Sequence, residues 1–338
     1  MDLETRIGQA VAETSFSGVV RVDRDGELAF AEAYGFAHRA FEIPNTVETR
    51  FGIASGAKGF TALTVMSLVE EGTLDLATTA RSLLGDDLPL IDDRVTVEHL
   101  LAHRSGIGDY FDEEIERPIT DYVLPVPMQE LDTIEGYLRV LDGYPMTFEP
   151  GERFTYCNGG YVVLSLLAER ASGRPFHELV VERVCVPAGL RDTAFLRSDE
   201  LPESTALGYL DATGNRTNVF HLPVRGSGDG GIYSTAADIR RLWTALFDGR
   251  IVPEEGVAEM VRPHSDAPAQ QARYGLGFWL HASLDVVELH GYDAGVSFRS
   301  IHDPDAGLTH TVISNTNEGA WRISELLDEA LLPAPGAQ

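Results

Sequence analysis

Cysteine, lysine and long apolar runs are scarce in this sequence, and each shortage excludes a class of protein. The 338 residues contain two cysteines, Cys157 and Cys185, which are too few for a disulfide framework or a zinc ribbon and fit a reducing compartment. No segment approaches the roughly 18 apolar residues of a membrane-spanning helix, and the first residues lack the basic and apolar regions of a signal peptide. We therefore expect a cytoplasmic protein with no membrane partner.

Positive charge is also in short supply. The chain has 26 basic and 53 acidic residues, which gives a formal net charge of −27. A field of this sign repels nucleic acid and strongly anionic substrates, and the sequence contains no basic run that overrides it. The expected partner is a small-molecule or short-peptide substrate, not nucleic acid, and the composition leaves the oligomeric state open.

The basic residues are unusual in kind. Of the 26, 25 are arginine and only Lys58 is lysine. The pKa of arginine is too high for a base, whereas burial and neighbouring charges can tune a lysine amine. A site that requires a deprotonatable amine would retain lysine, so Lys58 is a candidate catalytic residue.

The pattern of apolar residues and turns predicts an α/β (α+β) fold. Asp25-Gly26 between two apolar runs is a strong hairpin signal that begins an antiparallel sheet, and strand-like runs return near the C-terminus. Helical spacing and Pro or Gly punctuation fill the middle of the chain. The expected strands are 18–23, 27–31, 275–280, 285–289, 296–302 and 308–314, and the expected helices are 57–71, 97–103, 133–141, 160–171, 176–184, 237–247 and 321–331.

These elements predict two interleaved domains. Residues 1–54 and 235–338 form a sheet domain with the terminal helices packed on it, and residues 55–234 form an inserted, mostly helical domain. We expect the active site at their interface, with the loop over 106–146 at its border.

Ser55-Gly56-Ala57-Lys58 has the S-x-x-K form at the start of the helix expected over 57–71. Positions i and i+3 share one helical face, so a neutral Lys58 amine can take the Ser55 proton. The helix N-terminus favours the negative charge that develops when serine attacks a carbonyl. S-x-x-K is a common accident in a chain of this length, but with one lysine a serine three residues earlier arises by chance only about once in fifteen.

Tyr156 and Asn158 form a second polar element just before a helix. A phenol whose pKa is lowered by a neighbouring ammonium can exchange protons with the nucleophile and the leaving group, and Asn158 can orient Lys58 or a substrate amide. Tyr-x-Asn by itself is mostly a surface turn. Cys157 has no neighbour that would lower its thiol pKa, and we interpret it as a packing residue.

A third element, Leu289-His290-Gly291-Tyr292, brings a strand to a glycine. Glycine there allows a substrate backbone to approach the strand edge closely. His290, Gly291 and Tyr292 are therefore candidate substrate-binding residues.

In this order the three elements resemble those of the serine β-lactamase and penicillin-binding-protein-like hydrolases, particularly the branch that holds class C β-lactamases, D-amino-acid peptidases and carboxylesterases. Segments 100–106, 230–238 and 274–277 also resemble recurring segments of the family, so the resemblance covers most of the chain. It implies the β-lactamase/transpeptidase-like fold, an antiparallel sheet flanked by helices, with no cofactor and no metal.

By position, the resemblance makes Ser55 the nucleophile, Lys58 its base partner, Tyr156 the general base and acid, and Asn158 a positioning residue. The oxyanion hole would be the N–H groups of Ser55 and Tyr292.

The third element departs from the family's Lys-Thr-Gly or His-x-Gly pattern. If the family's glycine aligns with Gly291, Leu289 replaces the cation that holds a substrate carboxylate, and strand alternation turns His290 away from the cleft. We favour this alignment over a one-residue shift that restores His290 as the basic member. Arg299 on the next strand is another source of charge. Loss of a charge-assisted hydrogen bond costs about 1.5–3 kcal/mol, which weighs against efficient β-lactamase action.

Four further residues have simpler interpretations beside the functional ones. Asp229 and Asp293 either recognise a cationic amine or are solvated surface charges. His99 and His103 stand at i and i+4, which is half of a zinc site, but no further ligand cluster supports a metal.

The sequence therefore predicts a serine hydrolase that acts through a Ser55 acyl-enzyme on a small ester or amide, as a carboxylesterase or amidase does. A D-stereospecific peptidase, a weak β-lactamase and an acyltransferase are alternatives. A catalytically silent binding protein of the same fold is the alternative outside enzymes, and the retained lysine argues against it.

Overall fold

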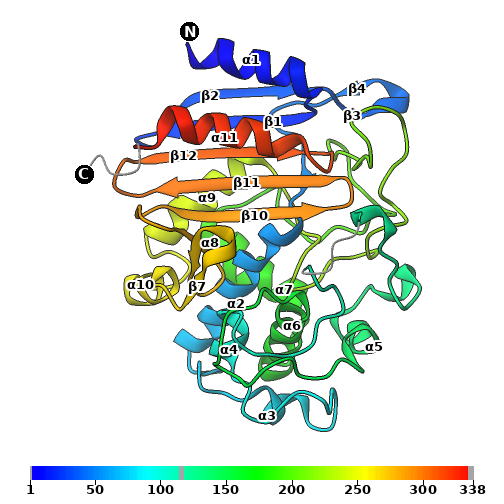
Figure 1. The fold of residues 1–338 in the computed structure, drawn as a ribbon, viewed down its shortest axis with the longest axis vertical. Helices are drawn as coiled ribbons and strands as arrows, with labels where there is room; N and C mark the ends of the chain where they lie inside the picture. Colours follow the sequence, from blue (N-terminus) through cyan, green and yellow to red (C-terminus); the bar gives the residue numbers. More distant parts are fainter. Residues whose placement is uncertain (1, 114–117, 334–338) are drawn as a thin grey trace.

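The computed structural model describes residues 2–113 and 118–333, with a broad sheet at one end and a group of helices below it (Figure 1). Within the described residues, eight strands form one antiparallel sheet in the order β2-β1-β12-β11-β10-β9-β8-β7. Their bounds are β1 Gly18–Arg24, β2 Glu27–Tyr34, β7 Ser265–Ala267, β8 Ala272–Tyr274, β9 Trp279–His281, β10 Val287–Asp293, β11 Val296–Asp303 and β12 Leu308–Ser314.

Helices cover both faces of this sheet. The terminal helices α1 (Leu3–Thr14) and α11 (Gly319–Leu331) pack against each other on one face, and α9 (Ala236–Phe247) packs on the other (Figure 1). Because successive strand residues point to opposite faces, Val20 is buried with the terminal helices and Val19 with the larger core on the α9 side. The N-terminal and C-terminal segments of the chain thus build the same layer.

The helical part is centred on α2 (Ala57–Glu70). Every residue from Ala57 to Met66 is buried, so this helix is surrounded by protein rather than amphipathic, and it packs against α6 (Asn158–Ser172). The shorter helices are α3 Ala80–Leu84, α4 Val97–Leu101, α5 Leu138–Leu141, α7 Phe176–Val180, α8 Val186–Ala188 and α10 Glu254–Val261. In the part of the chain that is described, no helix is both long and apolar enough to cross a membrane.

Two short strand pairs complete the fold. β3 (Phe36–His38) pairs with β4 (Ile43–Pro44), and β5 (Phe51–Gly52) pairs with β6 (Tyr233–Ser234). The β5–β6 pair joins the two places where we expect the chain to pass between domains. The domain boundaries at 54 and 235 stay a prediction.

Most of the predicted strands are confirmed, and one is largely wrong. The hairpin β1–β2 and the strands β11 and β12 lie where expected, and β10 continues past residue 289 through the third polar element. The expected strand over 275–280 is instead a turn that reaches β9 only at Trp279. A Cβ at Gly275 would lie 2.1 Å from the Met260 carbonyl oxygen, and Gly277 has a φ of 91°, so both glycines serve a tertiary contact and a turn.

The predicted helices are confirmed with shifted ends, and two are broken. The segment expected over 133–141 is a 3₁₀ turn, Ile134–Tyr137, followed by the single turn of α5. The segment expected over 176–184 is α7 followed by a π-helical turn, Val181–Cys185.

Candidate active site

Ser55 lies on a 3₁₀ turn, Ala54–Gly56, that continues directly into α2, so the serine sits at the helix entrance as predicted. Ala54 has a left-handed backbone, with φ 45°. Such a conformation is costly for alanine and is concentrated at functional sites. The Gly56 N–H donates to the Ile53 carbonyl at 2.9 Å and closes the turn.

Lys58 is buried, with 2% of its surface exposed, and its ammonium nitrogen reaches Ser55. The Nζ atom donates to Ser55 Oγ at 2.9 Å, to Asn158 Oδ1 at 2.8 Å and to the Asp229 carbonyl at 2.8 Å. Three hydrogen-bonding oxygens therefore surround the amine nitrogen. The lysine is thus held against Ser55 by the two segments that carry Asn158 and Asp229.

Tyr156 lies beside this pair, but its pKa shifts opposite to the predicted direction. Lys58 Nζ is 4.8 Å from the centroid of the Tyr156 ring. Burial raises the pKa of Tyr156 well above its usual value, the negative charge of Glu113 adds to the shift, and the hydrogen bond with Ser55 only partly opposes it. The prediction of a lowered pKa is wrong because desolvation of the phenolate dominates, and the resting phenol carries its proton.

Asn158 orients Lys58, as one of its two predicted roles requires. Its Oδ1 accepts from Lys58, while its Nδ2 donates to the Phe111 carbonyl at 3.1 Å and to Glu113 Oε1 at 2.9 Å. The amide is therefore committed to protein partners rather than to a substrate amide.

Asp109 fixes the start of α6, and sequence reasoning missed it. Its carboxylate accepts from the backbone N–H groups of Asn158 at 2.6 Å and Gly159 at 2.9 Å. Burial raises its pKa to about 6 despite these hydrogen bonds. A capping acid 49 residues away leaves no local signal, although it lies in the loop expected to border the cleft.

In the third element, the side chains of Leu289 and His290 point opposite to the directions that we predicted. Leu289 is 2% exposed and packs in the core, where a Cβ added to Gly59 of α2 would lie 2.7 Å from a Leu289 methyl carbon. His290 instead lines the cavity beside Ser55. The expectation that Leu289 faces the cleft is wrong because Gly59 leaves room for the leucine in the apolar core.

Gly291 is required by the protein itself. A Cβ at this position would lie 2.0 Å from the Ile53 carbonyl oxygen and 3.2 Å from the Gly56 nitrogen. The close neighbour is thus the turn that carries Ser55, whereas we expected a substrate backbone.

Replacing Gly291 by alanine should therefore lower the free energy of unfolding by about 1–3 kcal/mol, because β10 and the Ser55 turn must separate. Urea unfolding measures this change. Gly8→Ala in α1 is the matched control, since nothing lies within 4 Å of its added Cβ, and it should be neutral or stabilising. Equal stability of Gly291→Ala and the parent protein would contradict the packing argument.

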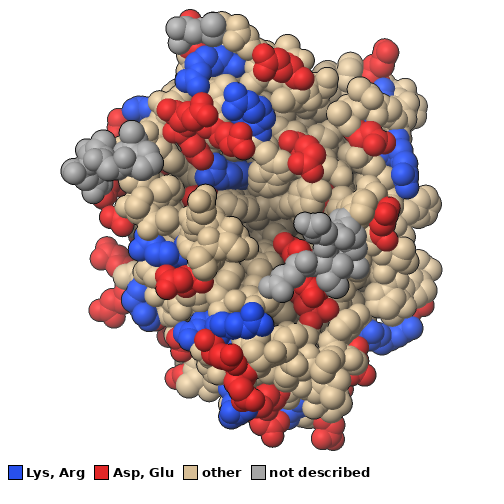
Figure 2. Space-filling view, in the orientation of Figure 1, with Lys and Arg blue, Asp and Glu red and all other residues tan. Residues whose placement is uncertain are grey.

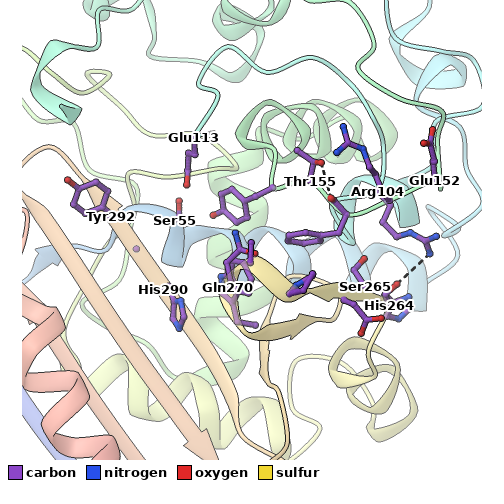
Figure 3. Close-up of a pocket in the computed structure, with 18 of the residues that line it drawn as sticks. Ser55, Arg104, Glu113, Glu152, Thr155, His264, Ser265, Gln270, His290 and Tyr292 are labelled. Atoms are coloured by element: carbon purple, nitrogen blue, oxygen red, sulfur yellow. Dashed lines mark hydrogen bonds between the residues drawn. The ribbon is translucent and has the colours of Figure 1, made fainter. Parts of the chain in front are cut away.

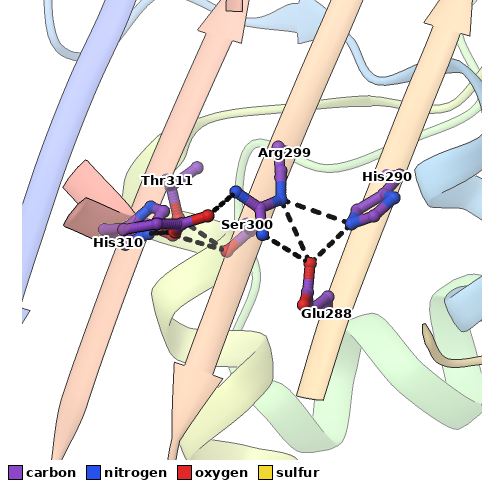
Figure 4. Close-up of polar contacts among 7 residues, drawn as sticks. Glu288, His290, Arg299, Ser300, His310 and Thr311 are labelled. Carbon is purple, nitrogen blue, oxygen red and sulfur yellow. Dashed lines mark hydrogen bonds and ion pairs between the residues drawn. The ribbon is translucent and has the colours of Figure 1, made fainter. Parts of the chain in front are cut away.

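Arg299 does not supply the missing cation to the cleft. Its guanidinium donates to Glu288 at 2.8 Å and pairs with Asp328, and the same Glu288 oxygen lies 2.6 Å from His290 Nε2 (Figure 4). Among the described residues Arg299 is not part of the cavity lining. Glu288 is nearly buried and its pKa is lowered by His290 and Arg299 against the effect of burial. The positive charge is neutralised within the sheet.

Ser55 opens into a cavity of about 830 Å³ on the face shown hollowed in Figure 2. Tyr156, His290, Gly291 and Tyr292 line it. His290 and Tyr292 flank Ser55 in Figure 3. All seven predicted site residues are thus brought together, since Lys58 and Asn158 connect to Ser55 by the hydrogen bonds above. The substrate-binding and oxyanion roles remain predictions.

Trp279 is a cavity residue that the sequence did not single out. Its ring stacks between those of Tyr156 and His290, with centroid distances of 5.8 Å and 5.7 Å. An aromatic residue in a strand-like run is ordinarily read as core, so no local signal marked it.

Three carboxylates line a second cavity that includes Ser55. Glu113, Asp229 and Asp293 line a smaller cavity of about 60 Å³ that also touches Ser55, and Figure 3 shows Glu113 directed towards Ser55. Burial raises the pKa of Asp293 to about 7, and the charges of Asp229 and Glu113 add to the shift. The surface-charge interpretation of Asp229 and Asp293 is therefore wrong.

The zinc and thiol interpretations gain no support. Residues 2–113 and 118–333 contain no group of three or more potential metal ligands. His99 Nδ1 accepts from the Thr96 N–H at 3.3 Å and caps its own helix. Cys157 is buried and its pKa is raised well above the usual value, so its thiol is protonated.

The antiparallel sheet with helices on both faces, and a serine at a helix entrance paired with a buried lysine, are features of the serine hydrolase family of the β-lactamase fold. The family model described as Beta-lactamase matches residues 3–332, and the chain belongs to this family. The predicted family and fold class are confirmed.

The names of relatives in this family indicate several different activities. Esterase EstB of Burkholderia gladioli is 30% identical over 315 residues, which cover 84% of this chain and 79% of EstB. A D-aminopeptidase of Brucella anthropi is 29% identical over 272 residues, which cover 78% of this chain but 49% of that protein, so the match spans about half of its length. The crystal structure of a penicillin binding protein from Bacillus halodurans aligns with a TM-score of 0.90 at 36% identity over 96% of this chain and 99% of the other.

Proposed function

We propose that this protein hydrolyses small esters or amides through an acyl-enzyme on Ser55. The observation that carries the proposal is the hydrogen bond of 2.9 Å between Ser55 Oγ and the buried Nζ of the one lysine in the chain. A nucleophile within hydrogen-bond reach of a base that a third group orients is the general arrangement of covalent catalysis, and Asn158 is that third group here.

The geometry supports a specific division of proton transfers. In its neutral form Lys58 accepts the Ser55 proton as Oγ attacks the substrate carbonyl. The bond to the leaving group then breaks, and the protonated Tyr156 phenol donates the proton that the leaving oxygen or nitrogen needs. Water then attacks the acyl ester and gives one proton to the Tyr156 phenolate. The bond between the acyl group and Ser55 Oγ breaks, and Oγ recovers its proton from Lys58, which returns the site to its resting state. The raised pKa of Tyr156 favours an acid role in the first half of this cycle.

Fluorophosphonate labelling tests the acyl-enzyme directly. We expect one adduct by intact mass, mapped by peptide digestion to Ser55, together with turnover of p-nitrophenyl acetate and butyrate. Absence of both would overturn the hydrolase and favour a catalytically silent binding protein. Release of an alternative ester when an alcohol is added would identify acyl transfer as a competing reaction.

The three carboxylates favour a second, narrower candidate, an aminoacyl ester or amide with a free amine. Glu113, Asp229 and Asp293 line the smaller cavity beside Ser55, whose described lining contains no arginine or lysine. The arginines Arg104 and Arg153 line the larger cavity instead. A cationic amine that enters the smaller cavity is stabilised by these carboxylates, whereas a substrate carboxylate there is repelled. The D-aminopeptidase among the relatives agrees with this candidate.

The pH dependence of amine recognition should follow Asp293. Because burial raises its pKa to about 7, Asp293 is neutral below that pH and charged above it. The ratio of kcat/KM for D-alanine p-nitroanilide to that for propionyl p-nitroanilide should therefore rise through about pH 7, and fall above about pH 8 as the substrate amine loses its proton. Both anilides undergo the same acylation chemistry, so effects of pH that are common to the two substrates cancel in the ratio.

Asp293→Asn supplies the second arm of this test. We expect it to lower the ratio by about ten- to a hundredfold above pH 7, the effect of one charge-assisted hydrogen bond of about 1.5–3 kcal/mol, and to remove its rise near pH 7. A ratio near one at every pH, in both proteins, would sink the amine candidate and leave the esterase. Faster turnover of a chromogenic cephalosporin than of either anilide would favour the β-lactamase instead.

A further inference from the structure

His103 belongs to the segment 100–106 that resembles a recurring segment of the family, and the proposed chemistry does not use it. It follows α4 and is 1% exposed. Its backbone has a φ of 54°, a left-handed conformation uncommon for residues other than glycine. A buried histidine kept in this conformation calls for a specific role.

The residues on either side of Tyr156, Thr155 and Cys157, each donate a backbone hydrogen bond to His103. The Thr155 N–H donates to the His103 carbonyl oxygen at 3.0 Å, and the Cys157 N–H donates to His103 Nδ1 at 3.1 Å. The imidazole also lies against the Tyr156 ring, with centroids 4.3 Å apart. His103 therefore contacts both the backbone on either side of Tyr156 and the Tyr156 ring.

The second hydrogen bond requires an unprotonated Nδ1, so the ring is neutral and carries its proton on Nε2. Burial lowers the pKa of His103 well below its usual value, and the positive charge of Lys58 acts in the same direction. Besides Tyr156, the phenol rings of Tyr161 and Tyr274 lie against the imidazole, at centroid distances of 4.9 Å and 4.8 Å. Within the described chain Nε2 has no hydrogen-bond partner, which costs stability, so stability alone does not explain a histidine here.

We propose that His103 is a positioning residue that holds the Tyr156 phenol in register with Ser55 and Lys58. The proposal rests on the hydrolase function above, because the phenol is its proton donor. Loss of the Nδ1 acceptor leaves the Cys157 N–H without a partner and releases the chain around Tyr156. A displacement of about 1 Å in a catalytic group lowers the rate about a hundredfold.

Two variants of His103 separate hydrogen bonding from bulk. His103→Leu removes the acceptor and should lower kcat for p-nitrophenyl butyrate about a hundredfold, with KM nearly unchanged. His103→Asn places Oδ1 where Nδ1 lies and tolerates the left-handed backbone, so it should restore most of kcat. His99→Leu is the matched control, because His99 Nδ1 also accepts a backbone N–H, that of Thr96 at the start of α4, and its kcat should stay at the parental value. Rates are taken per folded protein, measured by circular dichroism.

A double-mutant cycle with Tyr156→Phe gives the decisive result. If His103 acts through the phenol, His103→Leu should slow Tyr156→Phe no further. A full additional loss in that background, failure of His103→Asn to restore kcat, or an equal loss in His99→Leu would overturn the positioning role. These outcomes presuppose turnover by the parent protein, whose absence would instead overturn the hydrolase itself.

Discussion

Replacing Ser55 by alanine should reduce ester turnover to the uncatalysed background, a loss of roughly 10⁴- to 10⁶-fold in kcat. The reason is that the two other candidate nucleophiles near Ser55 are not activated: Cys157 is a buried, protonated thiol, and Tyr156 is a protonated phenol. Stopped-flow measurement of nitrophenol release checks this, since the burst that reports acylation should disappear together with the steady-state rate.

The fold should tolerate Ser55→Ala. Lys58 keeps its bonds to Asn158 and Asp229, so the loss of one hydrogen bond should change the free energy of unfolding by about 1 kcal/mol. Ser67→Ala on the same helix is the control, because the Ser67 hydroxyl bonds only to the Thr64 carbonyl and lies far from the cleft. Residual turnover within tenfold of the parent would show that Ser55 is not the nucleophile.

Replacing Lys58 by arginine should lower kcat about 10²- to 10⁴-fold although the charge is retained. Arginine cannot give up its proton, so it cannot act as the base that receives the Ser55 proton. Lys58→Met removes both charge and base at similar length. We expect both variants to be slow in the acylation burst, and fluorophosphonate labelling of Ser55 to slow in parallel.

The arginine variant decides between two roles of the lysine. If Lys58 acted only as a fixed positive charge beside Ser55, Lys58→Arg would keep most of the activity that Lys58→Met loses. Because Lys58 is 2% exposed, the larger side chain should also lower the melting temperature, so each kcat is referred to folded protein. Arg250→Lys is the control for exchanging arginine and lysine away from the site. The Arg250 guanidinium is half-exposed and pairs with Asp248, so this variant should keep the parental kcat.

Local sequence patterns were sufficient to predict that Ser55 and Lys58 lie together. The single lysine three residues after Ser55 at a helix entrance places both groups on one face, because i and i+3 neighbours meet in any helix. The same argument fails for Asp109 and for the Asp229 carbonyl, which reach the site from 49 and 171 residues away. Hydrophobic periodicity and local motifs do not indicate which residues from distant segments come into contact.

Burial explains the two wrong expectations at the site. The Tyr156 pKa was predicted from its neighbouring ammonium, but the depth of the phenol, and hence its desolvation, is set by the packing around it. The facing of Leu289 and His290 was predicted from an alignment, but it depends on the room that Gly59 leaves in another element. The desolvation of Tyr156 and the direction of the Leu289 side chain are both determined by packing in the folded core.

By itself, the sequence determined the serine and lysine, the helix that joins them, the ends of the sheet and the family, because these follow from local spacing and from short motifs in order. Only the tertiary structure decided which charges meet at Ser55. Glu113, Asp229 and Asp293 come from three separate segments, and their mutual repulsion and loss of water arise only once the folded chain holds them around one small cavity.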